Sequence, residues 1–204
     1  MANEVQGCGD YAVATLHTNA KAENPIGLEG YWTMSCHDVN GNLKWEEGFE
    51  NQVVQVGKIL MMNNTLYSQT AIVGPFLGLI ATATAYSPTD TFASHAGWTE
   101  FTNYTIGIGG SAVRGTATFS TATGNNVTTS GSNIVTSSAS AITYTITGAG
   151  GTITGCFLVT GTGATNAFSN TTVGTLWSAG GFSVAKTTTA GDTVAVTYST
   201  TATS

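Results

Sequence analysis

Apolar and polar residues alternate along several short stretches of the chain, most clearly in its second half. Alternation with a period of two predicts a strand that buries one face and exposes the other. The two clearest stretches are residues 141–147 and 193–198, where threonines take most of the remaining positions. We expect their apolar positions to form part of the core: Ile142, Tyr144 and Ile146 in the first stretch, and Val194, Val196 and Tyr198 in the second.

Two other stretches are almost continuously apolar. Residues 76–80 and 155–159 each hold four apolar side chains and one glycine. A short apolar run bounded by polar residues is typical of a strand that is buried on both faces. Residues 104–108 add another alternating strand, and weaker candidates lie at 116–120 and 176–178.

A hairpin is predicted where residues 30–35 and 43–46, both rich in strand formers, flank residues 38–42. The Asn-Gly pair at positions 40 and 41 favours a tight turn, because both residues tolerate positive φ. The same segment matches the first positions of a calcium-binding loop, but Phe49 stands where such a loop needs its closing acidic residue. We therefore favour the turn.

One helix is predicted, over residues 52–62. Val53, Val56 and Leu60 recur at spacings of three and four residues, which places them on one face of a helix. Asn51 precedes them as a candidate N-cap, and the two asparagines after residue 62 would end the helix.

Eight to ten strands and one short helix predict an all-β fold, namely a β-sandwich or a jelly-roll-like arrangement. We divide the chain into an N-terminal arm, residues 1–27, and a β-sandwich domain, residues 28–204. The domain includes a candidate hairpin–helix subregion at 28–66. The arm is set apart because it shows little alternation and mixes Asn, Gly, Lys, Glu and Pro.

Charged residues are scarce, and their balance excludes one class of partner. The chain carries 5 Lys and Arg against 11 Asp and Glu, which gives a formal net charge of −6. Five scattered cations cannot neutralise a phosphate backbone, so we expect no nucleic-acid partner. No apolar stretch approaches the ~20 residues of a membrane span, and the start lacks the pattern of a secretory signal. We therefore expect no membrane partner.

The residue types that commonly bind metals or react covalently are few and far apart. They are the histidines His17, His37 and His95 and the cysteines Cys8, Cys36 and Cys156. Cys36 and His37 are adjacent, so on a strand they would point to opposite faces. The chain has no Cys-x-x-Cys pair of the kind that many zinc sites use. We expect free thiols, no metal site and no bound cofactor.

No arrangement of catalytic residues stands out. Glu46, Glu47 and Glu50 form an acidic cluster, which we interpret as a solvated strand edge rather than as a general acid and base. Ser94 and His95 are adjacent, but no Gly-x-Ser-x-Gly motif surrounds any serine, and adjacency in sequence is not the geometry of a catalytic triad. We therefore expect no catalytic residues and no enzymatic activity.

Three segments together resemble a family of tailed-bacteriophage virion proteins that are associated with the capsid. The first segment is 40–47 with 51–54 and Gly57, the second is 90–100, and the third joins 174–180 to 190–194. The second segment is the most specific. The resemblance spans roughly residues 28–204 and implies a structural role without catalytic residues.

The resemblance implies a structural role in the virion, and our first hypothesis is a head decoration or cement protein. Such a protein binds the major capsid protein or neighbouring virion subunits, and it resides in the virion after assembly in the bacterial cytoplasm. Decoration at local threefold positions favours a homotrimer. A tail or fibre component is the alternative within this class.

A carbohydrate- or ice-binding module is the alternative from another class. A sugar site would need exposed aromatic side chains, for which Trp45, Trp98 and Trp177 are candidates. An ice-binding surface needs a regular array of threonines, and the irregular spacing of the Thr-x-Thr pairs argues against one.

Overall fold

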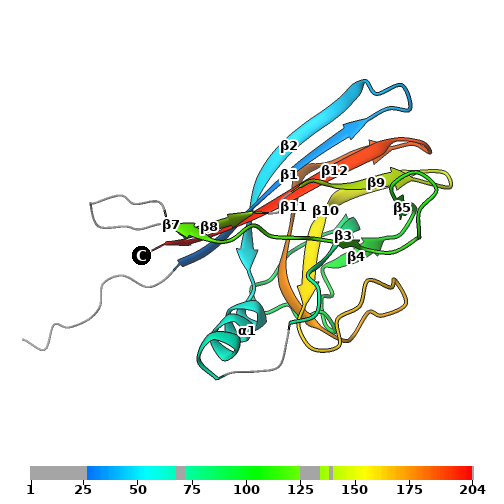
Figure 1. Ribbon diagram of the computed structural model, residues 1–204. Helices are drawn as coiled ribbons and strands as arrows, with labels where there is room; N and C mark the ends of the chain where they lie inside the picture. The colour runs from blue at the N-terminus through cyan, green and yellow to red at the C-terminus, as the bar shows by residue number, and fades with distance from the viewer. Residues whose placement is uncertain (1–26, 68–71, 125–133, 138–139, 204) are drawn as a thin grey trace, which may run out of the picture.

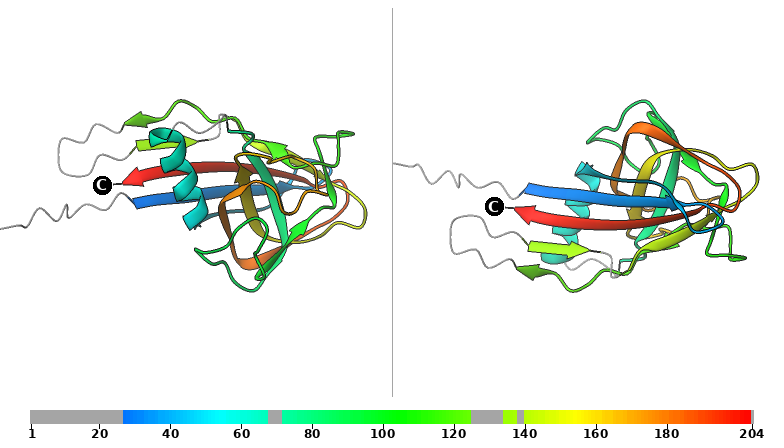
Figure 2. Two further views of the ribbon diagram at one scale, coloured as in Figure 1. Left: turned by 90° about the horizontal axis from the view of Figure 1, so that it is seen from below. Right: turned by 90° about the horizontal axis from the view of Figure 1, so that it is seen from above.

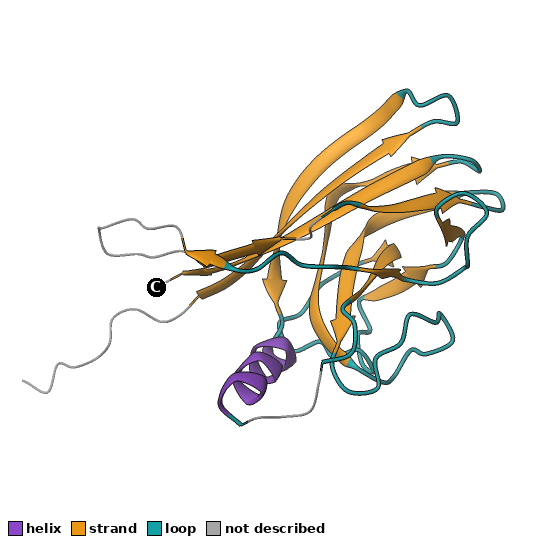
Figure 3. Cartoon of the chain, viewed as in Figure 1, coloured by secondary structure: helices purple, strands orange, loops and turns teal. Residues whose placement is uncertain are grey.

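The computed structural model describes residues 27–67, 72–124, 134–137 and 140–203. Strands make up most of this part of the chain, and one helix lies beside one end of them (Figures 1 and 3). The predicted all-β class is confirmed: two antiparallel layers pack together as a sandwich.

The longest strands come from the first and last parts of the described chain: β1 (Gly27–His37), β2 (Leu43–Val53), β10 (Gly151–Thr160), β11 (Thr175–Thr188) and β12 (Thr193–Thr203). The middle supplies shorter strands: β3 (Phe76–Ala83), β4 (Trp98–Phe101), β5 (Tyr104–Ile106), β6 (Gly115–Thr116), β7 (Thr123–Gly124), β8 (Ile134–Ser137) and β9 (Ile142–Ile146). The helix α1 (Gln55–Leu66) follows β2.

Hydrogen-bonded strands follow one another in one continuous order that passes from one layer into the other. One layer contains β2, β1, β12, β9 and β5 in that order, and β8 and β7 continue it from the end of β12. The other layer contains β11, β10, β3 and β4, with β6 beside β3. The layers join where β11 pairs with the end of β2, at Ser178 with Val53 and at Ala179 with Gln52. Beyond this corner β2 and β11 diverge into separate layers (Figure 1).

β1 and β2 form the predicted hairpin, and Asp38 fixes its turn. One carboxylate oxygen of Asp38 accepts hydrogen bonds from the backbone N–H groups of Asn40 and Asn42, each at 2.8 Å. Gly41 has a φ of 84°, a left-handed conformation that glycine adopts without a steric penalty. The prediction of a turn at this position is therefore confirmed.

The main core fills the space between the two layers. The six predicted residues of β9 and β12 all lie in it, each with 9% or less of its surface exposed. β1 contributes Trp32, Met34 and Cys36 at alternate positions. Because β1 pairs with β12 along all of its residues, the apolar positions of both strands come to the same side of the sheet.

A second core covers the outer face of β3 and β10. On β10, Cys156 and Leu158 face the main core, whereas Phe157 and Val159 face the second core. Side chains from the loop before β4, chiefly Phe92, close this second core from outside. The continuous apolar run of residues 155–159 is therefore a strand buried on both faces, as predicted.

The helix begins three residues later and ends four residues later than predicted. The last two residues of β2 pair with β11, so their backbone groups are already satisfied in the sheet and do not join the helix. The predicted N-cap was wrong. Val54 occupies that position without a side-chain hydrogen bond, and the amide of Asn51 donates instead to Ser178 Oγ. The two asparagines that were expected to end the helix lie within its last turns.

Some strands differ from the predicted ones in extent. β11 spans 14 residues, whereas only 176–178 were predicted. β6 consists of Gly115 and Thr116, so it shares only one residue with the weak candidate at 116–120, and β4 was not predicted. These strands form against partners that are distant in the sequence, such as β3 for both β4 and β6, so local alternation does not mark them.

The predicted arm, residues 1–27, lies outside the described residues except for Gly27, which pairs with Thr203 at the start of β1. The candidate hairpin–helix subregion, 28–66, contributes β1 to the main core. Its hairpin is thus packed together with the rest of the sandwich.

Shortening a side chain in the main core should cost far more stability than the same change at the surface. We expect Ile146→Ala to lower the free energy of unfolding by about 2–5 kcal/mol, because it leaves a cavity between the layers. Ile108→Ala is the matched control, since Ile108 is 92% exposed and should change stability by about 0.5 kcal/mol or less. Urea unfolding followed by fluorescence measures both values. Equal losses in the two variants would contradict the strand register.

Candidate functional site

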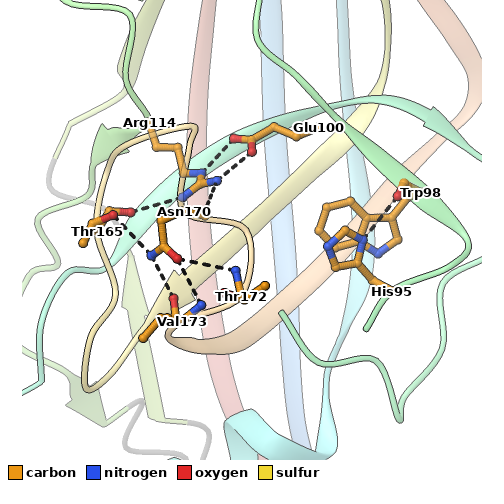
Figure 4. Close-up of polar contacts among 8 residues, drawn as sticks. All are labelled: His95, Trp98, Glu100, Arg114, Thr165, Asn170, Thr172 and Val173. Atoms are coloured by element: carbon orange, nitrogen blue, oxygen red, sulfur yellow. Dashed lines mark hydrogen bonds and ion pairs between the residues drawn. The ribbon is translucent and has the colours of Figure 1, made fainter. Parts of the chain in front are cut away.

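A buried cluster of polar side chains lies between β4 and the loop 161–174, on the outer side of the second core (Figure 4). At its centre is Arg114, whose side chain has no exposed surface. Its guanidinium makes a two-pronged contact with Glu100: Nε donates to one carboxylate oxygen and Nη2 to the other, each at 2.7 Å. This geometry suits the planar fork of arginine.

Carbonyl oxygens and aromatic rings around Arg114 also stabilise its positive charge. Nη1 donates to the carbonyl oxygen of Thr165 at 3.2 Å, and Nη2 donates to that of Asn170 at 2.9 Å. The guanidinium carbon lies 5.0 Å from the centre of the Phe92 ring and 5.5 Å from that of Phe157. A buried charge is tolerated when it has such hydrogen-bond partners and an opposite charge beside it.

Asn170 shapes the loop that receives the guanidinium. Its side-chain oxygen accepts hydrogen bonds from the backbone N–H groups of Thr172 and Val173, at 3.4 and 3.0 Å. Its amide nitrogen donates to Thr165 Oγ1 at 3.2 Å and to the Val173 carbonyl at 3.1 Å. The loop therefore carries its own hydrogen-bond framework, and Arg114 ties it to β4.

Burial raises the pKa of Glu100, while the hydrogen bonds and charge of Arg114 act in the opposite direction. A raised pKa is common for catalytic acids. Here, however, both carboxylate oxygens are held by one guanidinium. Arg114 and Glu100 therefore hold the loop 161–174 against β4, and we call this pair the clamp.

His95 and Ser94, the adjacent pair considered as nucleophile and base, serve the packing of the same region. The His95 ring stacks on Trp98 with centroids 3.7 Å apart, and His95 Nδ1 lies 3.2 Å from the Trp98 carbonyl oxygen (Figure 4). The Ser94 backbone pairs with Thr91 in an isolated β-bridge. The ring of His95 is thus used in stacking.

A second ion pair, in which only the carboxylate is buried, joins the start of β2 to the turn between β11 and β12. Lys44 Nζ lies 2.5 Å from Asp192 Oδ2, and only 3% of the Asp192 side chain is exposed. The same oxygen accepts a hydrogen bond from the Thr189 backbone N–H at 2.8 Å. Burial alone would raise the pKa of Asp192, but these hydrogen bonds outweigh it and hold the pKa below its ordinary value.

The two described cysteines are free thiols inside the main core, as expected. Burial, reinforced by the nearby carboxylate of Asp192, raises the pKa of Cys36 to about 11. Burial likewise raises the pKa of Cys156. Since the thiolate is the reactive form, both thiols are unreactive at neutral pH. Cys8 and His17 lie outside the described residues.

The acidic cluster on β2 is divided between partners and solvent. Glu47 pairs with Lys186 at 2.5 Å, whereas Glu46 and Glu50 are exposed. His37 lies on the opposite side of β1 from Cys36, which faces the core. In the part of the chain that the structure describes, no three His, Cys, Asp or Glu side chains come close enough to hold a metal ion.

The tryptophans considered for sugar binding do not form an exposed platform. Trp98 is 3% exposed, beneath His95. Trp45 packs edge-on against Phe182, with ring centroids 5.5 Å apart, and Trp177 Nε1 donates to Tyr198 Oη at 3.2 Å. Trp98 is therefore buried, whereas Trp45 and Trp177 are partly exposed and pack against other side chains.

Comparisons with known protein families, with curated proteins and with solved structures found no match. Across the described ranges, no helix is both long and apolar enough to cross a membrane.

Removing the guanidinium should destabilise the fold in a pH-dependent way. Arg114→Met leaves Glu100 buried without its cation, which should cost about 3–5 kcal/mol at pH 7. Because the folded-state pKa of Glu100 is already raised, protonation relieves part of this cost. The variant should therefore gain stability relative to the wild type as the pH falls from about 7 toward the ordinary carboxyl pKa of ~4.

Urea unfolding at several pH values measures this effect. The double variant Arg114→Met/Glu100→Gln is the control, since it has no carboxyl group to protonate at this position. A loss in Arg114→Met that is the same at every pH would contradict the assigned role of Glu100.

The Lys44–Asp192 pair should have the opposite pH dependence. A folded-state pKa below the ordinary value of 3.8 means that the stabilisation is fully present above pH 3.8 and is lost as the pH falls from there through the lower folded-state pKa. Between pH 5 and pH 3 the wild type should lose stability more steeply than Asp192→Asn. Lys44→Met should flatten the same slope. Thermal unfolding across this pH range checks the prediction, and parallel slopes for all three proteins would count against it.

Proposed function

We propose that this chain is a structural protein of a tailed-bacteriophage virion, which decorates the head and stabilises the major capsid lattice. The observation that carries this proposal is the place of the three family-like segments in the fold. Their characteristic side chains lie where separate elements of the sandwich contact one another. A family that shares a scaffold rather than a reaction is expected to share such residues.

The first and third segments meet at the corner between the layers. Asn51 donates to Ser178 Oγ, and the backbone N–H of Val54 donates to the Trp177 carbonyl at 3.0 Å. Gly57 lies so close to the same residue that a Cβ atom would be 2.8 Å from the Trp177 carbonyl oxygen. Glycine at position 57 therefore fits a close contact between helix and strand.

The second segment closes the second core. Phe92 and Trp98 pack on Phe157, with ring centroids 5.8 and 5.1 Å apart, and Glu100 receives Arg114. The most specific part of the resemblance thus consists of residues that hold a loop onto the sheet. This use suits a protein whose task is to keep its shape on a particle.

The surface composition fits assembly on a particle better than turnover of a substrate. The outer face of the β1–β2–β12 layer combines hydroxyl side chains, such as Thr197 and Ser199, with the exposed carboxylates of Glu29, Glu46 and Glu50. Such a face offers hydrogen bonds and negative charge to a neighbouring subunit. The major capsid protein is the proposed partner, and a homotrimer at local threefold positions is the proposed assembly.

Head binding can be tested with purified full-length chain and empty heads built from the major capsid protein encoded in the same genome. We expect the chain to sediment with the heads to a saturating, symmetry-related occupancy and to raise the temperature at which they break open. A variant lacking residues 2–26 keeps every described strand and should bind heads more weakly, because the arm is proposed to contact a neighbouring subunit.

Tails purified from the same phage provide the comparison. Sedimentation with tails and not with heads would overturn the assignment to the head and support the tail alternative. Binding to neither particle would refute the virion role. Full head occupancy by the truncated variant would refute only the role of the arm.

A further inference from the structure

The outward face of α1 is apolar and has no partner in the described part of the chain. Ile59, Met62 and Leu66 follow one another at spacings of three and four residues, so they form a stripe along one side of the helix. Their exposed fractions are 49%, 49% and 74%. An amphipathic helix normally turns such a stripe toward the core of its own domain. In α1 the stripe faces outward instead.

The other side of α1 explains why the stripe stays outside. The helix is seated on β11 through Gly57, which is buried against the Trp177 backbone. Val54, at the N-cap, lies in the second core. The contact with the sandwich is thus already made, and it leaves the stripe pointing away from the protein.

Further apolar groups continue the surface around the helix. Tyr67, directly after α1, is 72% exposed. Leu60 lies against Gly161, whose N–H donates to the carbonyl oxygen of the exposed Val73 at 3.0 Å. A hollow of about 370 Å³ opens beside the helix, between Ile59, Leu60 and Thr175. We call the stripe, Tyr67, Val73 and this hollow the α1 surface.

A surface of this kind is uncommon on a protein that works alone, because monomers rarely expose contiguous apolar patches of more than a few hundred Å². Isolated exposed apolar residues do occur elsewhere on this chain, such as Ile108 and Val184. The α1 surface differs in that Ile59, Met62 and Leu66 follow one another along the helix, and Ile59 also lines the hollow.

Charge decides between possible occupants. Lys58 is the only charged residue of α1, whereas the whole chain carries a net charge of −6. Two copies would repel each other least where carboxylates are few, and the α1 surface is such a place. A membrane surface is disfavoured, because binding to anionic lipids requires several basic residues along the polar face of the helix.

We propose that a second copy of this chain covers the α1 surface, with Leu66 and Tyr67 of each copy packing into the hollow beside α1 of its neighbour. Ile59 belongs both to the stripe and to the lining of the hollow, so the projecting side chains and the hollow lie next to each other, and identical copies can complement one another. The inference goes beyond the proposed function, because it assigns the surface of self-association and holds whether or not the chain binds a head.

Sedimentation velocity on the full-length chain, over a range of concentrations, tests this proposal. The wild type should sediment as an oligomer, and a dimer or a trimer equally supports the proposal. Leu66→Glu should raise the dissociation constant at least tenfold, because it would bury an unpaired carboxylate at the contact. Ile108→Glu is the matched control: it places the same charge at an exposed isoleucine just after β5, at the opposite end of the molecule from α1 (Figure 1). This control should associate like the wild type.

Circular dichroism verifies that each variant is folded, and Met62→Lys replaces Leu66→Glu if the latter is not. A wild type that is monomeric at all concentrations would overturn the proposal, as would an oligomer that neither α1 variant weakens. Two further results would assign the surface to another occupant and also overturn it. One is self-association that occurs only after residues 2–26 are removed. The other is binding of the monomer to phosphatidylserine vesicles that Leu66→Glu abolishes.

Discussion

The second core depends on a buried guanidinium. Arg114 can be buried because Glu100 and two carbonyl oxygens of the loop accept hydrogen bonds from its N–H groups. Two phenyl rings also lie beside the guanidinium. Those partners come from segments that share no strand pairing, so the arginine links β4, β10 and the loop 161–174. The continuous burial of β10 on both faces follows from this linkage, because the covered outer face of β10 is the one that Phe92 and Phe157 occupy.

The sequence predicted those features that depend on local pattern. Alternation located β9 and β12 with the correct inward faces, and Asn-Gly located the hairpin turn, because a period of two and a positive φ are properties of neighbouring residues. The start of α1 was misplaced because β11, more than a hundred residues away, pairs with the end of β2. The clamp was missed for the same reason: nothing near Arg114 in the sequence indicates that Glu100 and Asn170 will surround it.

The two sides of the molecule differ in what they offer a neighbour (Figure 2). The helix, which Figure 2 also shows from below, is seated on β11 and carries the apolar stripe of the α1 surface. The outer face of the β1–β2–β12 layer presents hydroxyl groups and the carboxylates of Glu29, Glu46 and Glu50. Apolar contact between copies and polar contact with another protein can therefore occur at the same time, as the proposed role on a capsid lattice requires.

We propose that this sandwich belongs to the surface of a phage head. Cryo-electron microscopy of the virion tests it most directly, with particles that lack the protein as the reference. We expect difference density of the size and shape of the sandwich on the outside of the head, repeated at positions that follow the capsid symmetry. Difference density confined to the tail, or absent from the particle altogether, would contradict it.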